Sequence, residues 1–326
     1  MIARHFSGAA TVSFAFVFPG QGSQSLGMLS SLAATEEVRT TFAEASAVLG
    51  HDLWELTQSG PAERLNATEN TQPAMLAAGV ALWRLWQRCG GGHPAAVAGH
   101  SLGEFTALVC AGVLDFRLAT DLVSFRGRIM QEAVPNGAGG MAAIVGLEDA
   151  QVLEACRTAA ASGVVEAVNF NAPAQVVIAG ERAAVQHAMQ AATALGAKRV
   201  VELQVSVPSH SSLMRPAAAR FAEHLQRVAF AAPRIPWVSA VDARTHLEPA
   251  EIRTLMGGQL ASPVRWRDTV RALAEYPIAQ IIECGPGRVL TGLNRRIERR
   301  PDCQPMSIED DASIEAALRA VGGTRS

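Results

Sequence analysis

The chain has 326 residues, of which 49% are hydrophobic, and its 28 basic and 30 acidic residues leave a net charge of −2. This composition is typical of a globular protein with a sizeable core, and it gives no reason to expect nucleic acid or an anionic membrane as a partner. No run of about 18 apolar residues could span a bilayer, and the short N-terminal segment lacks the apolar region of a signal peptide. We therefore expect a cytoplasmic protein.

The first strand is expected at residues 12–18, because this run is almost entirely apolar, as in a strand buried on both faces of a parallel sheet. A glycine-rich turn at residues 20–24 follows, and after it we expect a helix. The next expected elements are helices at residues 36–49, 73–88, 104–111 and 116–133, with a strand at 95–98.

The pattern then changes to strand, helix, strand, strand, helix, strand between residues 141 and 207, which is the order of a ferredoxin-like unit. After it we expect helices at 216–230, 250–260, 267–274 and 313–321, and strands at 237–239 and 278–283. The predicted fold class is α/β, with an α/β-hydrolase-like main body and an inserted ferredoxin-like α+β subdomain. We place the large catalytic subdomain at residues 1–136 and 208–326 and the small one at 137–207, with a cleft where they meet.

The five cysteines are odd in number and widely spaced, and no two of them form a C-x-x-C pair. This distribution favours neither a disulfide framework nor a zinc site. We interpret them as small core residues and expect no metal centre.

Ser101 lies in a G-x-S-x-G sequence, Gly99 to Gly103, between the strand at 95–98 and the helix that we expect to start at the serine. This strand–turn–helix setting is that of a nucleophile elbow, whose tight turn exposes the hydroxyl. The free N–H groups at the start of the helix can hold a developing oxyanion. The motif alone is weak evidence, so its surroundings decide its meaning.

His210 follows the predicted insert, in the sequence SVPSH at residues 206–210. A serine hydroxyl is a poor nucleophile unless a neighbouring base takes its proton, and histidine suits that role at neutral pH. The alternative is a solvated loop histidine.

The glycine-rich turn after the first strand, residues 18–24 (FPGQGSQ), can supply a second oxyanion donor from the backbone N–H of Gln21. A dinucleotide-binding fingerprint is a competing interpretation, but Ser25 stands where its third glycine should be. A plain tight turn is the other alternative.

Arg126 lies within a largely apolar predicted helix, where a buried guanidinium must find an anion. It could grip a substrate carboxylate through two parallel hydrogen bonds. The alternatives are a structural salt bridge or a side chain that reaches water.

Taken together, these motifs resemble those of the malonyl-CoA:acyl carrier protein transacylase family, from Val12 almost to the C-terminus. The matching motifs, in order, are FPGQGSQ at 18–24, GHSLGE at 99–104, Arg126, VNFN at 168–171, SVPSH at 206–210 and GPG at 285–287. Shorter blocks at residues 71–73 and 175–180 match as well.

The resemblance implies a role for each matching residue. Ser101 would be the acylated nucleophile, His210 its base, and the N–H groups of Gln21 and Leu102 the oxyanion hole. Arg126 would bind the free carboxylate of malonate, and the backbone carbonyl of Gln259 would orient His210 in place of an aspartate. Four further positions match residues near the acyl pocket, without separate roles: His100, Met130, Asn169 and Asn171.

The function that the resemblance implies is transfer of a malonyl group from malonyl-CoA to the phosphopantetheine thiol of acyl carrier protein, through a malonyl ester on Ser101, in support of fatty-acid synthesis. The expected partners are malonyl-CoA and the carrier, with no cofactor, and we expect a monomer. Because carrier proteins are acidic, the arginines at 295, 296, 299 and 300, on one side of a predicted helix, could form the docking surface; a solvated helix face is the alternative.

Three other functions remain open from the sequence. One is a serine hydrolase of esters or thioesters, which would share Ser101 and His210 but has no need of Arg126. The second is a stand-alone acyltransferase that serves a polyketide synthase. The third is a non-catalytic carrier-binding module, against which the intact pair of Ser101 and His210 argues.

Overall fold

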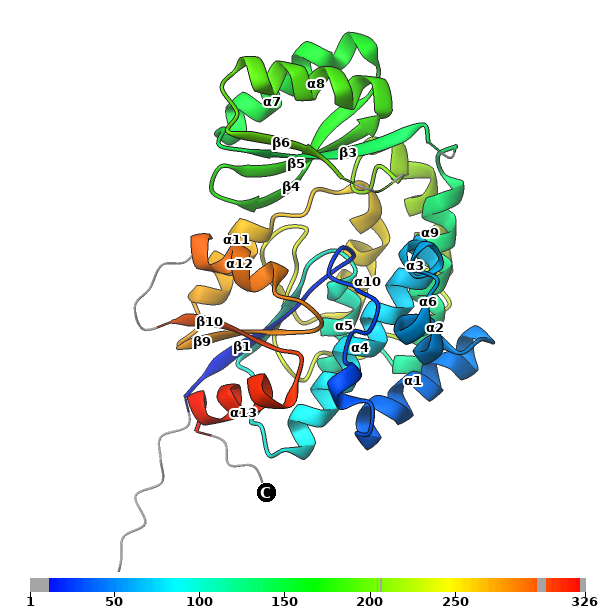
Figure 1. Cartoon of the computed structure of the whole chain (residues 1–326), viewed down its shortest axis with the longest axis vertical. Coiled ribbons are helices and arrows are strands. Elements are labelled where there is room, and N and C mark those ends of the chain that lie inside the picture. The colour runs from blue at the N-terminus through cyan, green and yellow to red at the C-terminus, as the bar shows by residue number, and fades with distance from the viewer. Residues whose placement is uncertain (1–11, 136, 204, 206, 298–302, 323–326) are drawn as a thin grey trace, which may run out of the picture.

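The fold is built on a six-stranded sheet with the strand order β10-β9-β1-β2-β7-β8 (Figure 1). The structure is a computed structural model that describes residues 12–135, 137–203, 205, 207–297 and 303–322. The strands of this sheet are β1 Phe14–Phe18, β2 Ala96–Gly99, β7 Trp237–Val238, β8 Thr245–His246, β9 Gln280–Cys284 and β10 Gln304–Ile308. All neighbours pair in parallel except β7 and β8, which form an antiparallel pair at one edge. The predicted parallel sheet is confirmed.

Helices cover both faces of this sheet because successive side chains of a strand point to opposite sides. Phe14, Phe16 and Phe18 of β1 belong to the larger apolar cluster, whereas Ala15 and Val17 belong to the smaller one on the other face. The larger cluster is covered by α1 Glu36–Leu49, α2 Leu53–Ser59, α3 Ala62–Asn66, α4 Thr68–Arg88, α5 Gly103–Cys110, α6 Phe116–Glu132, α9 Arg215–Leu225, α10 Pro249–Gly258 and α13 Asp311–Ala320. The smaller cluster is covered by α11 Trp266–Ala274 and α12 Val289–Ile297. None of the helices in the described ranges is long and apolar enough to cross a membrane.

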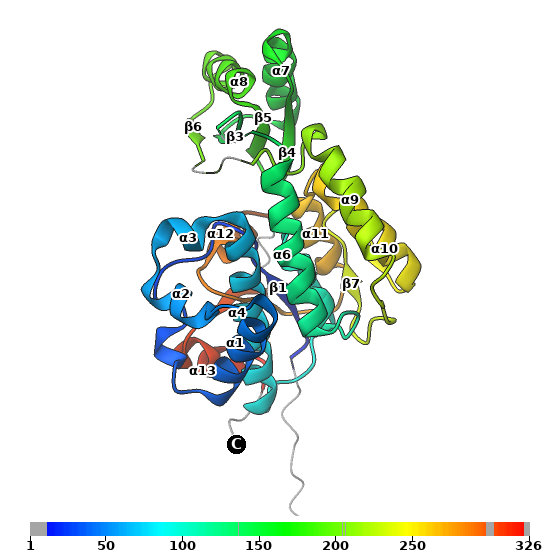
Figure 2. The ribbon, with the colours of Figure 1, turned by 90° about the vertical axis from the view of Figure 1, so that its right-hand side faces the viewer.

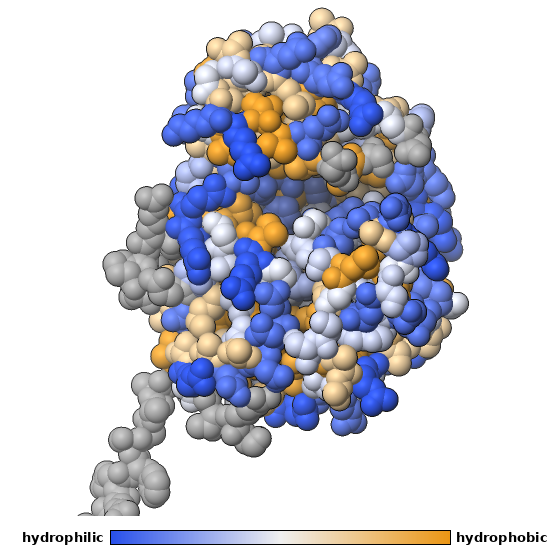
Figure 3. Space-filling view, in the orientation of Figure 1, coloured by the Kyte–Doolittle hydropathy of each residue, from blue (hydrophilic) through white to orange (hydrophobic). Residues whose placement is uncertain are grey.

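A second, four-stranded antiparallel sheet forms a separate unit above the main body (Figure 2). Its elements are β3 Gly139–Val145, α7 Asp149–Ala159, β4 Val165–Ala172, β5 Gln175–Glu181, α8 Arg182–Ala194 and β6 Arg199–Glu202. The strand order β4-β5-β3-β6 and the two helices packed on one face confirm the predicted ferredoxin-like unit. Its boundaries at residues 137 and 207 stay a prediction. The molecule is hollowed where this unit meets the main body (Figure 3), and residues from both line the cleft.

The predicted helix after the glycine-rich turn is wrong. Residues 20–29 form turns, and only a short 3₁₀ helix, Ser30–Leu32, follows them. Gly22 and Gly27 have φ angles of 103° and 77°, which lie in the left-handed region and cannot continue a right-handed helix.

The cysteines are placed as the sequence predicted. All of them are buried, and none forms a disulfide within the part of the chain that the structure describes: Cys89, Cys110, Cys156, Cys284 and Cys303. The cysteine side chains therefore act as small core residues rather than as a covalent framework.

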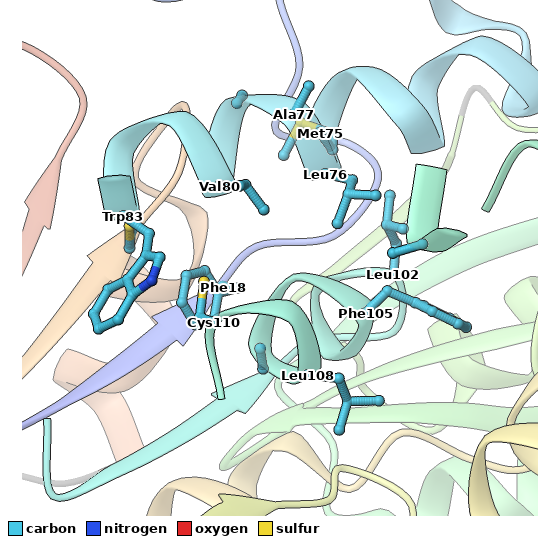
Figure 4. Packing of buried hydrophobic residues seen from close by; sticks show 14 of the residues in the cluster. Phe18, Met75, Leu76, Ala77, Val80, Trp83, Leu102, Phe105, Leu108 and Cys110 are labelled. Carbon is cyan, nitrogen blue, oxygen red and sulfur yellow. The ribbon is translucent and has the colours of Figure 1, made fainter. Parts of the chain in front are cut away.

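The helix α5 packs closely against β1 because both ends of the preceding turn are glycine. A Cβ atom on Gly103 would lie 2.0 Å from the carbonyl oxygen of Phe18, and one on Gly99 would lie 1.9 Å from the carbonyl carbon of Gly103. Figure 4 shows this helix among Phe18 of β1 and the apolar side chains of α4. Only glycine permits this approach of backbone to backbone.

We expect Gly103→Ala to destabilise the protein by about 2 kcal/mol or more, because backbone atoms must move to admit the methyl group. At an exposed helix position the same change stabilises by up to about 1 kcal/mol. Gly292→Ala in α12 is the matched control, since no atom lies within 4 Å of its added Cβ. Urea unfolding of both variants measures the difference; equal free energies of unfolding would contradict the close-packing argument.

Candidate active site

Ser101 occupies the turn between β2 and α5, at the carboxyl end of the central parallel strands. Its φ angle of 52° lies in the left-handed region, as expected of a nucleophile elbow. The helix begins at Gly103 rather than at the serine, which corrects the predicted start by two residues, because this φ angle is not helical. The strained turn directs the hydroxyl into the cleft, and its Oγ lies 2.8 Å from Nε2 of His210.

Backbone groups orient the ring of His210 on the side away from Ser101. Its N–H donates to the carbonyl of Leu260 at 2.9 Å, and its Nδ1 faces the carbonyl oxygens of Gln259 at 3.1 Å and Ser262 at 3.0 Å. Because both carbonyls can only accept, Nδ1 carries the proton and Nε2 presents its lone pair to Ser101. The carbonyl of Gln259 is the one that the family resemblance implied, whereas that of Ser262 was not foreseen.

The imidazole of His210 is neutral at physiological pH. Its ring is buried, and burial together with the neighbouring Arg126 cation lowers its pKa to about 3. A neutral imidazole beside a hydroxyl can accept the hydroxyl proton as the oxygen attacks an acyl group.

Arg126 projects from α6 and is buried, with a relative exposure of 1%. Its Nη2 lies 3.3 Å from Oγ of Ser101 and donates to Oε1 of Gln259 at 2.9 Å, while Nη1 donates to Oε1 of Gln72 at 2.8 Å. Burial lowers its pKa to about 9, so the side chain is still a cation at neutral pH. Within the described ranges no carboxylate oxygen lies within 4.0 Å of it, which argues against the structural salt bridge.

Gln21 and Leu102 both line the cleft, and the backbone amide of each is a candidate oxyanion donor. Neither amide donates a hydrogen bond to any other group of the described residues. Both lie beside the glycines that bring β1 and the elbow into contact, since a Cβ on Gly20 would lie 2.4 Å from the carbonyl oxygen of His100. Two free donors next to a nucleophile are what an oxyanion hole requires.

The cleft has a volume of about 260 Å³, enough for a short acyl group and the end of a thiol-bearing arm. His100, Met130, Asn169 and Asn171 all line it, as the resemblance implied. Nε2 of His100 lies 2.8 Å from Oδ1 of Asn171, and burial lowers the pKa of His100. Oδ1 of Asn169 is buried and has no hydrogen-bond partner among the described residues.

Two buried polar residues at this site were missed by sequence reasoning. Gln72 in α4 is fully buried and ties Arg126 to the sulfur of Met130, to which its Nε2 donates at 3.3 Å. Glu104, directly after the elbow, is buried in α5 and accepts a hydrogen bond from the side chain of Gln259. The signal that could have found Glu104 is the one used for Arg126, namely an ionisable side chain within an otherwise apolar helix.

Arg295 and Arg296 are exposed on the last turn of α12, a helix that also lines the cleft through Leu290 and Leu293. A side-chain nitrogen of Arg296 donates to Oε1 of Gln175 in the small unit. Arg299 and Arg300 lie outside the described residues, and the docking role of the whole group stays a prediction.

The fold and this site define a serine acyltransferase: an elbow serine, a neutral histidine, two free amides and a buried cation share one cleft. Residues 15–307 match the family model described as Acyl transferase domain. The chain is 54% identical over 306 residues to the malonyl CoA-acyl carrier protein transacylase of Salmonella typhimurium, covering 94% of this chain and 98% of that protein.

Solved structures agree with this relationship. One is a holo type II polyketide synthase acyl carrier protein in complex with its malonyl-transacylase, at 52% identity and TM-score 0.92, covering 94% of this chain and 99% of that one. Another is the malonyl CoA-acyl carrier protein transacylase of Coxiella burnetii, at 45% identity and TM-score 0.93, covering 96% and 98%. The chain therefore belongs to the malonyl-CoA:acyl carrier protein transacylase family.

Because the pKa of His210 is lowered from 6.5 to about 3, acid should not protonate the base until well below its ordinary range. We expect the second-order rate constant for modification of Ser101 by a sulfonyl fluoride to stay level from about pH 7 to about pH 5. Labelling rates measured by mass spectrometry check this, with Ser101→Ala as the unlabelled control. A fall in rate centred near the ordinary histidine value of about 6.5 would contradict the buried, neutral base.

Proposed function

We propose that this protein transfers a malonyl group from malonyl-CoA to the phosphopantetheine thiol of an acyl carrier protein, through a malonyl ester on Ser101, and so supplies fatty-acid synthesis. The observation that carries the proposal is the buried Arg126 cation 3.3 Å from Oγ of Ser101. A malonyl group differs from other short acyl groups by its free carboxylate, and a buried guanidinium is a partner for that group. The names of the similar proteins support the same substrate and partner.

In the first half-reaction Oγ of Ser101 attacks the thioester carbonyl while Nε2 of His210 takes the hydroxyl proton. The amides of Gln21 and Leu102 hold the oxyanion of the tetrahedral intermediate, each contributing about 3 kcal/mol to transition-state stability. The intermediate collapses as the carbon–sulfur bond breaks, and the sulfur of coenzyme A leaves with the proton from His210. A malonyl ester remains on Ser101.

In the second half-reaction the carrier thiol enters the same cleft. His210 takes its proton, the sulfur attacks the malonyl ester, and the carbon–oxygen bond to Ser101 breaks as the proton returns to Oγ. Ester and thioester are exchanged with no change in oxidation state, so the exchange needs no redox cofactor, and with two amides to hold the oxyanion it needs no metal. The chemistry is symmetrical, which suits a cleft that admits two thiols in turn.

The exposed Arg295 and Arg296 support docking of an acidic carrier at the mouth of the cleft, because α12 joins them to the cleft lining. A serine hydrolase is the second candidate, but it would leave the buried cation beside Ser101 without a purpose. A polyketide synthase acyltransferase would use the same chemistry with another carrier, and in the similar complex a malonyl-transacylase is bound to a type II polyketide synthase carrier.

Incubation with malonyl-CoA should add about 86 Da, the mass of one malonyl group, to the protein at Ser101. Ser101→Ala should gain no mass. Addition of a phosphopantetheinylated carrier should remove the label from the enzyme and place it on the carrier thiol. Release of free malonate at the same rate without a carrier would instead identify a hydrolase.

Arg126→Ala should lower kcat/KM for malonyl-CoA about a hundredfold, because it removes two charge-assisted hydrogen bonds to the carboxylate, and should preserve or increase transfer from acetyl-CoA. Arg128→Ala is the matched control, since Arg128 lies on the same helix but is exposed. Steady-state transfer rates with both substrates measure the effect. Normal malonyl transfer by the Arg126 variant would refute the carboxylate clamp.

A further inference from the structure

Glu104 is a buried carboxylate that the mechanism above does not use. It lies in the first turn of α5, three residues after Ser101, with a relative exposure of 1%. Its Oε1 accepts hydrogen bonds from Oγ of Ser239 at 3.1 Å and from the N–H of Ala240 at 2.8 Å. Its Oε2 accepts from Nε2 of Gln259 at 2.5 Å. Burial raises the pKa of Glu104 to about 7, while the three donors that point at this group and the nearby Arg126 cation favour its ionised form.

The side-chain amide of Gln259 has one possible orientation because of these neighbours. Its Nε2 lies between two acceptors, the Glu104 carboxylate and the carbonyl oxygen of Ser101 at 2.9 Å. Its Oε1 accepts from Nη2 of Arg126 at 2.9 Å. Turning the amide over would place an NH₂ group against the guanidinium and an oxygen against two acceptors, which leaves every partner unsatisfied.

Gln259 therefore joins the parts of the site that lie far apart in the sequence. Its backbone carbonyl meets Nδ1 of His210, while its side chain joins Ser101 to Arg126. The contacts of Gln259 with His210 and Arg126 are buried and that with Ser101 is partly buried, so water does not readily replace a hydrogen bond that is lost here. Glu104 anchors the end of this chain of contacts against β7 and the backbone that follows it.

We propose that Glu104 is a positioning residue for malonyl specificity: through the amide of Gln259 it holds the Arg126 guanidinium at the distance from Ser101 that a malonyl carboxylate requires. The inference rests on the proposed malonyl transfer. Glu104 does not itself line the cleft; its side chain is joined to Arg126 by hydrogen bonds through Gln259, and its charge also stabilises the Arg126 cation.

The isosteric substitution Glu104→Gln tests this chain of donors and acceptors with little change in volume. A glutamine has one oxygen and one NH₂ group, but Gln259 and Ala240 both present donors. If the new oxygen faces Ala240, two NH₂ groups meet at Gln259; the reverse orientation places an NH₂ group against the N–H of Ala240. The contact between the two NH₂ groups can be relieved only if the Gln259 amide turns over, and that rotation breaks its hydrogen bond to Arg126.

The experiment compares kcat/KM for malonyl-CoA and acetyl-CoA transfer to a phosphopantetheinylated carrier. We expect Glu104→Gln to lower the malonyl-to-acetyl ratio at least about tenfold, the effect of one lost charge-assisted hydrogen bond in the clamp. The same substitution in a Gln259→Leu background should leave the ratio unchanged, because no amide remains to be turned. Glu283→Gln is the matched control: this buried carboxylate caps α12 through Leu290 and Thr291, and its loss should not move the ratio.

If Glu104 had a purely structural role, Glu104→Gln would lower the free energy of unfolding and both transfer rates, and the malonyl-to-acetyl ratio of kcat/KM would not change. That result would overturn the proposal. A raised ratio would also overturn it, since it would mean that Glu104 acts as a competing negative charge near the substrate carboxylate. Equal effects of Glu104→Gln with and without Gln259 would exclude action through that amide. Failure of the wild-type enzyme to transfer malonyl groups would instead refute the proposed function.

Discussion

A positive charge held out of water beside a nucleophilic hydroxyl is the interaction on which this structure depends. The guanidinium of Arg126 is almost fully buried, and its partners are amide oxygens of Gln72 and Gln259 rather than a carboxylate. Amide dipoles orient a cation without neutralising it, so the attraction for an incoming anion is preserved. A direct ion pair with the protein would have stabilised the arginine better and left it less able to bind a ligand.

Sequence patterns were sufficient for the centre of the main sheet, because β1 and β2 are uniformly apolar and the elbow has its own signature. The edge strands β8 and β10 were not predicted, since they are short and contain polar residues. The helix expected after the first turn is absent, because glycines at residues 22 and 27 adopt left-handed conformations. Sequence patterns also placed Ser101, Arg126 and His210 only as separate candidates. Gln259, a buried residue at the start of a 3₁₀ turn, connects these three residues. No local sequence pattern indicates that its side chain contacts Glu104 of α5 and Arg126 of α6.

The missed residues share a physical cause. A polar side chain on a helix is usually solvent-facing, but tertiary packing buries Gln72 against α6 and Glu104 against Gln259 and the segment that follows β7. The close contact of α5 with β1 is what brings the elbow, the free amides and the buried polar groups into one volume. The close backbone contacts at Gly99 and Gly103 thus bring the side chains of the site within contact distance of one another.

The attachment of His210 to two carbonyl oxygens has a chemical consequence for what the cleft can process. A carboxylate would stabilise the imidazolium that forms during attack, whereas neutral carbonyls beside a cation leave it strongly acidic, and so short-lived. The same base must take the proton of the Ser101 hydroxyl, so attack by that oxygen depends on the two amides that hold the oxyanion as the proton moves. Return of the proton to a departing sulfur is strongly favourable, because a thiol, which ionises near pH 8.5, is a much weaker acid than this imidazolium. The arrangement thus favours rapid expulsion of a thiol once the tetrahedral intermediate has formed.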